Sequence, residues 1–379
     1  MTMTAAQSTT QASMDLLSHL LLGHTYTTAA GVPNDRSSSL GWSANQLPEL
    51  CAMSREEFDG FINLAGLNHV IIRGLETFVH TADVQKNPSH IEWAESALAD
   101  ERVRIKSAIQ RLREICTALE EAGHDVAVIK SLDHWPDLGS DLDLYTDADP
   151  REVAQLMKRS FHAEIASRSW GDRLANKWNF LVPGLSEAVE IHMGRLGQTG
   201  EQVGMASRLI ERARVISIDG HRFRVPSASD RILISTLQRM YRHFYFRLCD
   251  IVDSAALAES GGIDYRDLRD SASDAGIWEG VATYLVIVSD YVKTYRGSGL
   301  DLPRFVREDA RFGGAEIYFN KDFLRIPIMP QSAKLYGTQL AGLMRRCELH
   351  SGARLSLLPW LATAAVVGQK ITGSDKGIW

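Results

Sequence analysis

The chain has 379 residues, of which 45% are hydrophobic and 23% are charged, and its formal net charge is −6. This is the composition of a folded globular protein, and it excludes a chain that is mostly disordered. The acidic balance also excludes a nucleic-acid-binding protein whose whole surface is basic, although local basic patches remain compatible with it.

The cysteines and the terminal segments indicate a reducing compartment. The sequence contains four cysteines that lie far apart and form no Cys-x-x-Cys pair: Cys51, Cys116, Cys249 and Cys347. Their spacing argues against a disulfide scaffold and against a zinc-finger type of motif. No basic segment precedes an apolar one at the N-terminus, and the apolar run 355–367 is too short to cross a bilayer. We therefore expect a cytoplasmic protein with no membrane partner.

The first third of the chain has helical patterns. Residues 1–14 are rich in Thr, Ser, Ala and Gln, and we expect them to be unordered. Apolar residues at helical spacing predict a helical region over 15–122, interrupted by a Gly-, Pro- and Ser-rich loop at 31–48. The clearest pattern spans 91–122 and is followed by Gly123, a residue typical of the position after a last helical turn.

Between 123 and 225 the pattern changes to that of strands. Runs at 125–130, 141–145, 177–182 and 188–193 predict strands, and 214–225 predicts a hairpin that turns at Asp219-Gly220. Between them, Asp149 followed by Pro150 predicts the start of a helix. These elements predict a small α/β core.

The remaining chain, 226–379, again favours helices. Ser227 and Asp230 resemble a capping box, an apolar stripe follows over 232–252, and helical patterns continue over 264–295. The segment 297–335 contains several Gly and Pro residues and is expected to be an irregular connection. The predicted fold class is α+β, with a mixed-sheet core flanked by N-terminal and C-terminal helical regions.

Three carboxylates are the candidate metal ligands. Asp141 and Asp143 lie one residue apart on a predicted strand, so both side chains point to the same face. Two carboxylates held this close repel each other unless a cation lies between them, and Mg²⁺ prefers oxygen ligands. Glu190, on a later strand, supplies a third carboxylate to this face if the two strands are neighbours. A site of this kind suits two Mg²⁺ ions and attack on a phosphate.

Residues near the carboxylates are candidates for binding a nucleotide's phosphates. Lys130 and Ser131 close the first predicted strand, and nine residues separate Ser131 from Asp141. A small hydroxyl residue in such a turn presents N–H and O–H groups to phosphate oxygens, and a lysine adds positive charge. Gly139 and Ser140 permit close approach of the backbone to the metal site. Basic residues between the second and third carboxylate segments are candidates for a triphosphate clamp: Arg168, Arg173 and Lys177.

The order of motifs along the chain resembles that of the family of uncharacterised bacterial nucleotidyltransferases. The motifs are IKS, DLD, VEIH, a hairpin ending in RVPS, and a helix with Arg242-His243 and Asp250. That family belongs to the polymerase-β-like nucleotidyltransferase superfamily, and the resemblance covers about residues 100–295. It implies a minimal nucleotidyltransferase core with a metal triad at Asp141, Asp143 and Glu190. The superfamily's Gly-Gly or Gly-Ser turn corresponds to Lys130-Ser131. His192 also fits the family pattern, which assigns it no role.

These observations predict an enzyme that uses Mg²⁺ to transfer a nucleoside monophosphate from an NTP, ATP among the candidates, to an acceptor hydroxyl, with release of pyrophosphate. Asp141 and Asp143 are expected to bind both ions, and Glu190 to complete the site and help deprotonate the acceptor. We expect a small molecule or peptide as the acceptor, because the acidic net charge argues against a broad RNA surface. A toxin-like enzyme acting on tRNA 3′ ends is the alternative.

Two other functions are compatible with the same residues. A lone Asp-x-Asp motif also occurs in glycosyltransferases, which use it to hold a metal-bound sugar nucleotide. A catalytically degenerate nucleotide-binding module is the other possibility, because the Lys130-Ser131 turn departs from the superfamily pattern. An EF-hand is excluded, since Thr146 occupies the position where the loop requires glycine.

The segment 208–247 holds nine arginines and no lysine against three acidic residues, a local net charge of +6. Its cations alternate with aromatic residues after Arg239, an arrangement that suits a triphosphate, a base or an RNA end. Alternatively, the aromatic residues pack on the core while the arginines pair with Asp250 and Asp253.

Overall fold

A five-stranded mixed sheet lies at the centre of the computed structural model, which describes residues 5–23, 53–81, 87–361 and 363–364. The predicted loop at 31–48 lies outside these residues. The strand order is β1-β2-β5-β4-β3. The strands are β1 (Val126–Val128), β2 (Asp141–Thr146), β5 (Ala188–Met193), β4 (Lys177–Leu181) and β3 (Glu164–Ile165). The prediction of an α+β fold with a mixed sheet between helical regions is confirmed.

The two longest strands of the sheet, β2 and β5, are parallel neighbours, whereas the other pairs are antiparallel. Residue 143 lies opposite residue 190 in the register of this parallel pair. Leu142 and Leu144 alternate with the aspartates of β2 and are fully buried. The apolar side chains of β2 therefore face the core, which leaves the opposite face of the strand to Asp141 and Asp143.

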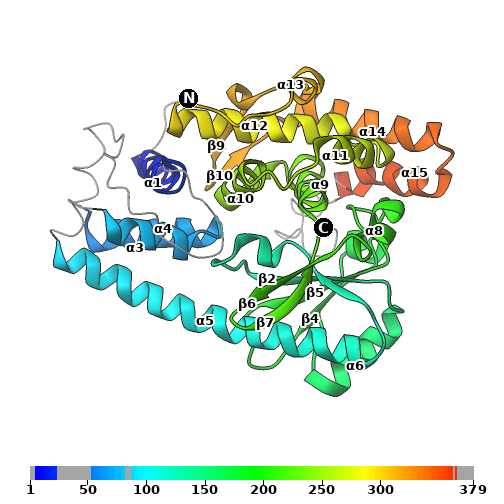
Figure 1. Ribbon diagram of the computed structural model, residues 1–379, viewed down its shortest axis with the longest axis horizontal. Helices are drawn as coiled ribbons and strands as arrows, with labels where there is room; N and C mark the ends of the chain where they lie inside the picture. The colour runs from blue at the N-terminus through cyan, green and yellow to red at the C-terminus, as the bar shows by residue number, and fades with distance from the viewer. Residues whose placement is uncertain (1–4, 24–52, 82–86, 362, 365–379) are drawn as a thin grey trace.

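Helices cover both sides of the sheet (Figure 1). Figure 1 shows α5 (Pro88–Glu121) and α6 (Pro150–Phe161) on one side, and α9 (Ala228–Gln238) and α10 (Leu248–Glu259) on the other. Asp149 caps α6 by accepting a hydrogen bond from the Arg151 N–H, as predicted. The predicted hairpin forms β6 (Arg214–Ile218) and β7 (His221–Val225), and β7 packs beside β1.

The other elements complete the two helical regions. The N-terminal region also contains α1 (Ala5–Leu22), α3 (Arg55–Leu67) and α4 (Ile71–His80). Two short helices lie in the connections between strands: α7 (Trp170–Leu174) between β3 and β4, and α8 (Val203–Leu209) between β5 and β6. The C-terminal region continues with α11 (Tyr265–Asp274), α12 (Trp278–Arg296), α14 (Ala333–Arg345) and α15 (Leu349–Ser356).

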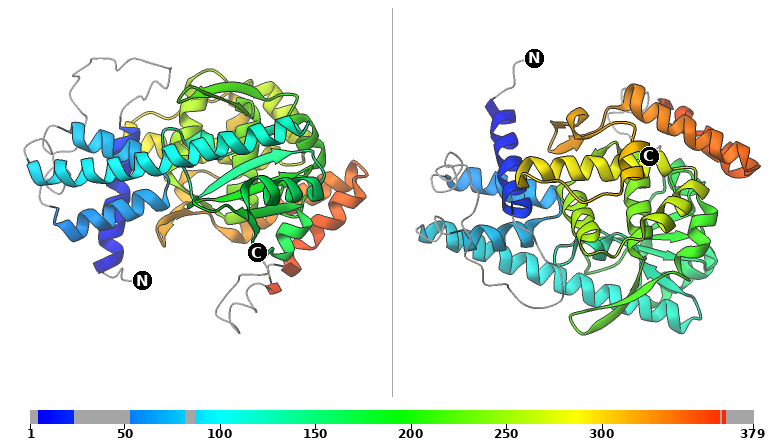
Figure 2. Two further views of the ribbon diagram at one scale, coloured as in Figure 1. Left: turned by 90° about the horizontal axis from the view of Figure 1, so that it is seen from below. Right: turned by 45° about the horizontal axis from the view of Figure 1, so that its top comes forward.

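Helix α1 corrects the prediction that residues 1–14 are unordered, because the chain is helical from Ala5. Its inner face, which includes Met14 and Leu17, is fully buried and anchors the helix. The Ser18 hydroxyl lies 2.8 Å from the Tyr291 hydroxyl of α12, and the Arg296 Nε donates to the Leu22 carbonyl. The two views of Figure 2 show α1 beside α12, so the N-terminal and C-terminal helical regions pack on each other.

The apolar stripe at 232–252 does not form one helix, which corrects a second prediction. Helix α9 ends at Gln238, a π-helical turn follows over Arg239–His243, and Phe244 takes a left-handed conformation with φ of 55°. The chain then forms strand β8 (Tyr245–Phe246) before α10 begins. The apolar periodicity alone favours a helix here, but β8 forms hydrogen bonds with β10 in place of helical ones.

The segment 297–335 is also more regular than predicted. It contains a short helix, α13 (Arg304–Asp309), and two strands, β9 (Tyr318–Asn320) and β10 (Phe323–Arg325). Together with β8 these strands form a three-stranded sheet in the order β8-β10-β9. The strands are so short that their sequences carry almost no period-two pattern, and long-range pairing decides their structure.

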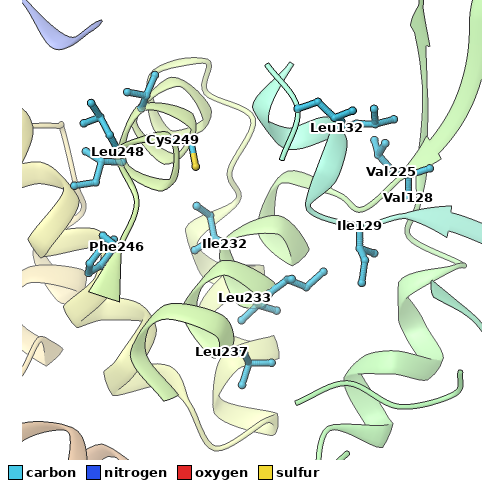
Figure 3. Packing of buried hydrophobic residues seen from close by; sticks show 14 of the residues in the cluster. Val128, Ile129, Leu132, Val225, Ile232, Leu233, Leu237, Phe246, Leu248 and Cys249 are labelled. Carbon is cyan, nitrogen blue, oxygen red and sulfur yellow. The ribbon is translucent and has the colours of Figure 1, made fainter. Parts of the chain in front are cut away.

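One apolar core connects the sheet with the C-terminal helices. Ile129, which follows β1, points toward Leu233 and Leu237 of α9, whereas Val128 lies beside Val225 of β7 (Figure 3). This packing holds α9 across the face of the sheet that carries the aspartates. Among the described residues, no helix combines the length and the apolar character that crossing a bilayer requires.

Candidate active site

The structure brings two of the three predicted carboxylates directly together. Asp143 on β2 and Glu190 on β5 are register partners on adjacent parallel strands, so their side chains leave the sheet on the same face. Both are about nine-tenths buried. Oxygens of these two carboxylates and a ring nitrogen of His192 all lie within 4.8 Å of one another. The strands of Asp143 and Glu190 are therefore neighbours, which is the condition for Glu190 to join the aspartates.

Asp141 lies at the start of β2, where the strand opens to solvent. Its side chain is exposed and lines the same cavity as Asp143 and Glu190, but it lies outside their 4.8 Å cluster. Within the described part of the chain, its carboxylate makes no ion pair. Asp141 therefore stands at the mouth of the site, while Asp143 and Glu190 form its floor.

Glu190 is the centre of a buried polar network. Its Oε1 lies 2.8 Å from His192 Nε2 and 3.4 Å from Lys130 Nζ, and its Oε2 lies 2.8 Å from Lys177 Nζ. Lys177 also pairs with Asp172 at 2.9 Å. Lys177 is therefore held behind Glu190 and does not line the cavity, unlike Lys130, Ser131 and Gly139. Because both oxygens of Glu190 are engaged, this network fixes the orientation of its carboxylate.

The protonation of the cluster follows from its burial and its charges. Burial raises the pKa of Asp143 to about 7; Lys130 opposes this rise and the negative charge of Glu190 adds to it. Burial also opposes ionisation of Glu190, but the ammonium groups of Lys130 and Lys177 outweigh it and hold its pKa well below the usual range. Burial lowers the pKa of His192 to about 4, so a neutral imidazole donates its Nε2–H to Glu190.

Lys130 is held beneath the carboxylates by an unusual turn. The Ser131 N–H donates to the Ile129 carbonyl at 2.7 Å, and Lys130 between them has φ of 63° and ψ of −58°. This is a γ-turn with positive φ, a rare and strained conformation for a residue with a side chain. It directs the Lys130 ammonium onto Asp143, with which it forms a short ion pair. Strain of this kind concentrates at functional sites.

Ser131 supports β2. Its hydroxyl oxygen accepts a hydrogen bond from the Asp143 N–H at 2.7 Å and donates to the Asp141 carbonyl at 3.1 Å. Since its own N–H is used in the γ-turn, Ser131 positions the aspartates from below. Its side chain is almost fully buried, although the residue lines the cavity.

The loop before β2 is anchored from two helices. Asp137 accepts hydrogen bonds from the Ile72 N–H at 2.6 Å and from the Arg73 guanidinium at 2.7 Å. Arg104 of α5 donates to the Leu138 carbonyl at 2.9 Å. Gly139 lines the cavity, whereas Ser140 is exposed, with its hydroxyl 3.5 Å from an Asp141 oxygen. This anchoring sets the position at which Asp141 enters the strand.

Positive side chains form the opposite wall of the cavity, which has a volume of about 170 Å³. The break after α9 turns three arginines of the segment 239–247 toward the carboxylates: Arg239, Arg242 and Arg247. Arg239 is buried and paired with Asp250 at 2.7 Å, as the non-functional alternative predicts. By contrast, Arg242 and Arg247 make no ion pair with any described residue. Asp253 pairs with Arg73 and His134 instead of with this segment.

The donor set fits Mg²⁺. Carboxylate oxygens are the ligands that Mg²⁺ prefers, and three carboxylates share this cavity. The Lys130 ammonium lies between Asp143 and Glu190, which marks the place where their charges need a cation. Asp141, Asp143 and Glu190 would hold the ion, with Lys130 moving aside to make room.

A second hollow adjoins the first and shares Lys130, Gln238 and Arg242 with it. Apolar side chains form most of its wall, among them Ile129, Leu196 and Leu237. The amide of Gln198 lies in this wall and is buried, and neither its oxygen nor its nitrogen has a hydrogen-bond partner among the described residues. A buried amide without partners is costly and indicates a missing ligand or water.

Sequence reasoning missed Gln198, Asp172 and His69, a histidine that lines the cavity from the end of α3. None of them lies in a motif, and only the tertiary fold places them at the site. Two arginines suggested for a triphosphate clamp lie elsewhere. Arg168 stacks on Trp178 at 4.1 Å and Arg173 lies over Trp170 at 5.6 Å, and neither lines the cavity.

Comparison with known proteins finds a match among solved structures but none among family models or curated proteins. No family model matches the chain, and no curated protein matches it either. Among solved structures, it is similar to an antigenic nucleotidyltransferase-like protein from Paracoccidioides brasiliensis, with 15% identity and a TM-score of 0.31. The alignment covers 49% of this chain and 92% of that one. Because a TM-score below 0.5 does not establish a common fold, the function proposed below rests on the geometry of the site.

Proposed function

We propose that the protein is a Mg²⁺-dependent nucleotidyltransferase that transfers a nucleoside monophosphate from an NTP to an acceptor hydroxyl. The observation that carries this proposal is one cavity with two opposed walls. One wall holds Asp141, Asp143 and Glu190, and the other holds Arg242 and Arg247 without acidic partners among the described residues. A metal-bound triphosphate has this distribution of charge, with its cation toward the carboxylates and its phosphate oxygens toward the arginines.

In the reaction, the acceptor oxygen attacks the α-phosphorus of the NTP. The new bond joins that oxygen to phosphorus, and the bond from phosphorus to the oxygen bridging toward the β-phosphate breaks, so that pyrophosphate leaves. When bound, Mg²⁺ would lower the pKa of the acceptor hydroxyl and neutralise charge on the phosphates. Lys130 and Arg242 are positioned to bind the departing pyrophosphate.

The hydroxyl proton requires an acceptor, and the geometry favours Asp141 over Glu190. Both oxygens of Glu190 are already engaged by His192, Lys130 and Lys177. Asp141 is exposed at the mouth of the cavity and carries no ion pair with any described residue, so an acceptor entering from solvent meets it first. We therefore assign deprotonation to Asp141 and place Glu190 as a fixed ligand.

The adjoining hollow is proposed to hold the nucleobase. It shares Lys130 and Arg242 with the phosphate side and offers apolar walls for a base. The unpartnered amide of Gln198 supplies one donor and one acceptor, which suits the polar edge of a base. Acceptors of small size, such as a metabolite or a peptide hydroxyl, suit the limited cavity volume.

Transfer of label tests the proposal. The purified protein is incubated with Mg²⁺ and each α-³²P-labelled NTP in turn, with a cell extract as the source of acceptor. We expect one labelled product that depends on Mg²⁺ and disappears with Asp141→Asn or Asp143→Asn. Asp147→Asn, a change at the exposed residue that follows this strand, serves as the control and should leave labelling intact.

Absence of labelling from all four NTPs would contradict the transfer reaction. Labelling that persists in Asp143→Asn would contradict the assignment of the site. Tighter binding of a sugar nucleotide than of any NTP would favour the glycosyltransferase alternative. The choice between a small acceptor and a tRNA 3′ end follows from the size of the labelled product and its sensitivity to ribonuclease.

A further inference from the structure

A second cluster of ligand-type side chains lies beside the carboxylates. It consists of His69, His134 and Cys249, whose ligand atoms all lie within 4.8 Å of one another. His69 and His134 line the same cavity as the aspartates, whereas Cys249 is fully buried behind them. We propose that these three residues bind a zinc ion next to the candidate active site.

Three separate parts of the fold converge on this cluster. His69 follows helix α3 in the N-terminal region, His134 ends the 3-10 turn after β1, and Cys249 lies in the first turn of α10. Asn68 joins two of these parts, since its side-chain oxygen accepts from the Leu248 N–H at 2.9 Å and its carbonyl accepts from the Cys249 N–H at 3.2 Å. Cys249 projects from α10 toward the turn that carries Leu132 (Figure 3).

The distances suit a metal ligand set. His134 Nε2 lies 3.9 Å from Cys249 Sγ. Two such ligands at usual zinc distances and a tetrahedral angle lie about 3.6 Å apart, so a small closure brings them into place. The combination of thiolate and imidazole ligands selects zinc over Mg²⁺. Three protein ligands with an open fourth position, here on the cavity side, are typical of catalytic zinc sites.

The outer contacts of the cluster also match those of a zinc site. His134 Nδ1 lies 2.5 Å from an Asp253 oxygen, which leaves Nε2 directed toward Cys249. Metal-binding histidines commonly donate their second ring nitrogen to a carboxylate in this way. His69 Nδ1 is buried and has no hydrogen-bond partner among the described residues, so it is available as a ligand. These contacts orient the histidines without a metal.

Gly139 leaves room for the His69 ring. A Cβ atom at position 139 would lie 2.8 Å from His69 Cε1 and 3.0 Å from His69 Nδ1. His69 itself has a left-handed backbone with φ of 54°, which is uncommon for a residue other than glycine. The glycine and the strained backbone together place this imidazole next to His134, with ring centroids 5.5 Å apart.

The charge of the surroundings is complementary. Arg73 pairs with Asp137 at 2.7 Å and with Asp253 at 2.6 Å, so this buried trio carries one net negative charge. A zinc ion held by one thiolate and two neutral imidazoles carries one net positive charge, which balances the charge of this trio. The thiol of Cys249 gives up its proton as it becomes a zinc ligand, and the buried charge of the bound state is balanced.

A nucleophilic role for Cys249 fits less well. Cys249, His134 and Asp253 resemble a Cys-His-Asp arrangement, but the cysteine is fully buried and does not line the cavity. A nucleophile must reach its substrate, whereas a zinc ligand need not. The structure therefore favours a metal site over covalent catalysis.

Cobalt substitution tests the site, because Co²⁺ replaces zinc and gives a thiolate-to-cobalt charge-transfer band. We expect the full-length, reduced, metal-free protein to bind one Co²⁺ per chain with this band, and zinc to displace it. Cys249→Ser should abolish the band. His69→Gln should keep the band but raise the cobalt concentration required by at least about tenfold. Cys116→Ser, at a buried cysteine outside the cluster, should behave like the wild type.

Absence of the band in the wild-type protein at saturating Co²⁺, or its persistence in Cys249→Ser, would overturn the zinc site. If Cys249→Ser does not fold, the cobalt titration of His69→Gln decides. A cobalt concentration at half-saturation equal to that of the wild type would then overturn the proposal. Asp143→Asn should retain the band, which separates this result from the Mg²⁺ site. The zinc site does not depend on the proposed nucleotidyltransferase activity.

Discussion

Gln198 gives the clearest prediction for a single residue. Its buried amide has no described hydrogen-bond partner, so replacing it with an apolar side chain of similar shape removes a cost and no contact. Gln198→Met should therefore raise the free energy of unfolding by about 1 kcal/mol, measured by urea denaturation. The same change should weaken NTP binding and reduce discrimination among the four bases.

Gln202 provides the matched control. It is also buried, but its amide donates to the Ala275 carbonyl at 3.2 Å, so Gln202→Met should lower the stability. Loss of stability in Gln198→Met would mean that the amide has partners in the folded protein. Unchanged base preference would mean that the hollow does not bind the nucleobase.

Asp143 shows how burial couples the site to pH. Its pKa is about 7 in the folded protein and near 3.8 in the unfolded chain, so folding takes up a proton between these pH values. The stability that the protonated Asp143 contributes is therefore fully present below pH 3.8, declines as the pH rises from 3.8 to 7, and is lost above pH 7. Above pH 7 the ionised carboxylate costs stability, which a bound cation would restore. Metal binding is accordingly expected to be tighter at pH 8 than at pH 6.

The break between α9 and α10 is the element that creates the basic wall. If the helix continued through 239–252, the arginines would follow its periodicity instead of turning toward β2. The π-helical turn and β8 present Arg242 to the cavity and leave Arg239 buried against Asp250. Two neighbouring arginines thus have different roles, which mutation can separate.

Arg239→Gln should destabilise the protein by about 3–5 kcal/mol, because it leaves Asp250 buried without its partner. Arg242→Gln should leave the melting temperature nearly unchanged and weaken binding of NTP more than of the nucleoside, because it removes charge from the phosphate side. Calorimetric unfolding and nucleotide titration measure the two effects. Equal affinity of Arg242→Gln and wild type for NTP would remove Arg242 from the phosphate site.

The strands that carry the carboxylates were predictable, because each has a strong local pattern. The alternation in DLDLY and the apolar run in AVEIHM fix the faces of β2 and β5, and their pairing then brings Asp143 next to Glu190. The short strands β8, β9 and β10 have no such pattern. Long-range pairing forms them, so the apolar stripe at 232–252 wrongly predicts a continuous helix.

At the site, the acidic motif could be predicted but its surroundings could not. Asp141 and Asp143 share a motif, whereas the partners of Glu190 depend on how the strands pair. Lys177 of β4, for example, reaches Glu190 because it lies opposite His192 of β5. The cluster of His69, His134 and Cys249 could not be predicted either, because only the tertiary fold brings its members together. Its members are separated by up to 180 residues, and the cysteine spacing alone indicated no zinc site.

At the scale of the whole molecule, the cavity lies where three parts of the chain meet. The N-terminal region supplies His69, the sheet supplies the carboxylates, and the C-terminal region supplies the arginines. Helix α1 reinforces this assembly, since the Tyr295 hydroxyl of α12 donates to Asp15 at 2.7 Å. The site therefore depends on the packing of both helical regions and not on the sheet alone.

The central claim is that Asp141, Asp143 and Glu190 form one cation site for a nucleotide's triphosphate. Isothermal titration of each NTP into the full-length protein at pH 8, with and without Mg²⁺, tests it most directly. Binding should require Mg²⁺ in the wild type and in Asp147→Asn, and should fall at least about tenfold (about 1.4 kcal/mol) in Asp143→Asn. Mg²⁺-independent binding, or equal affinity in Asp143→Asn, would contradict the account.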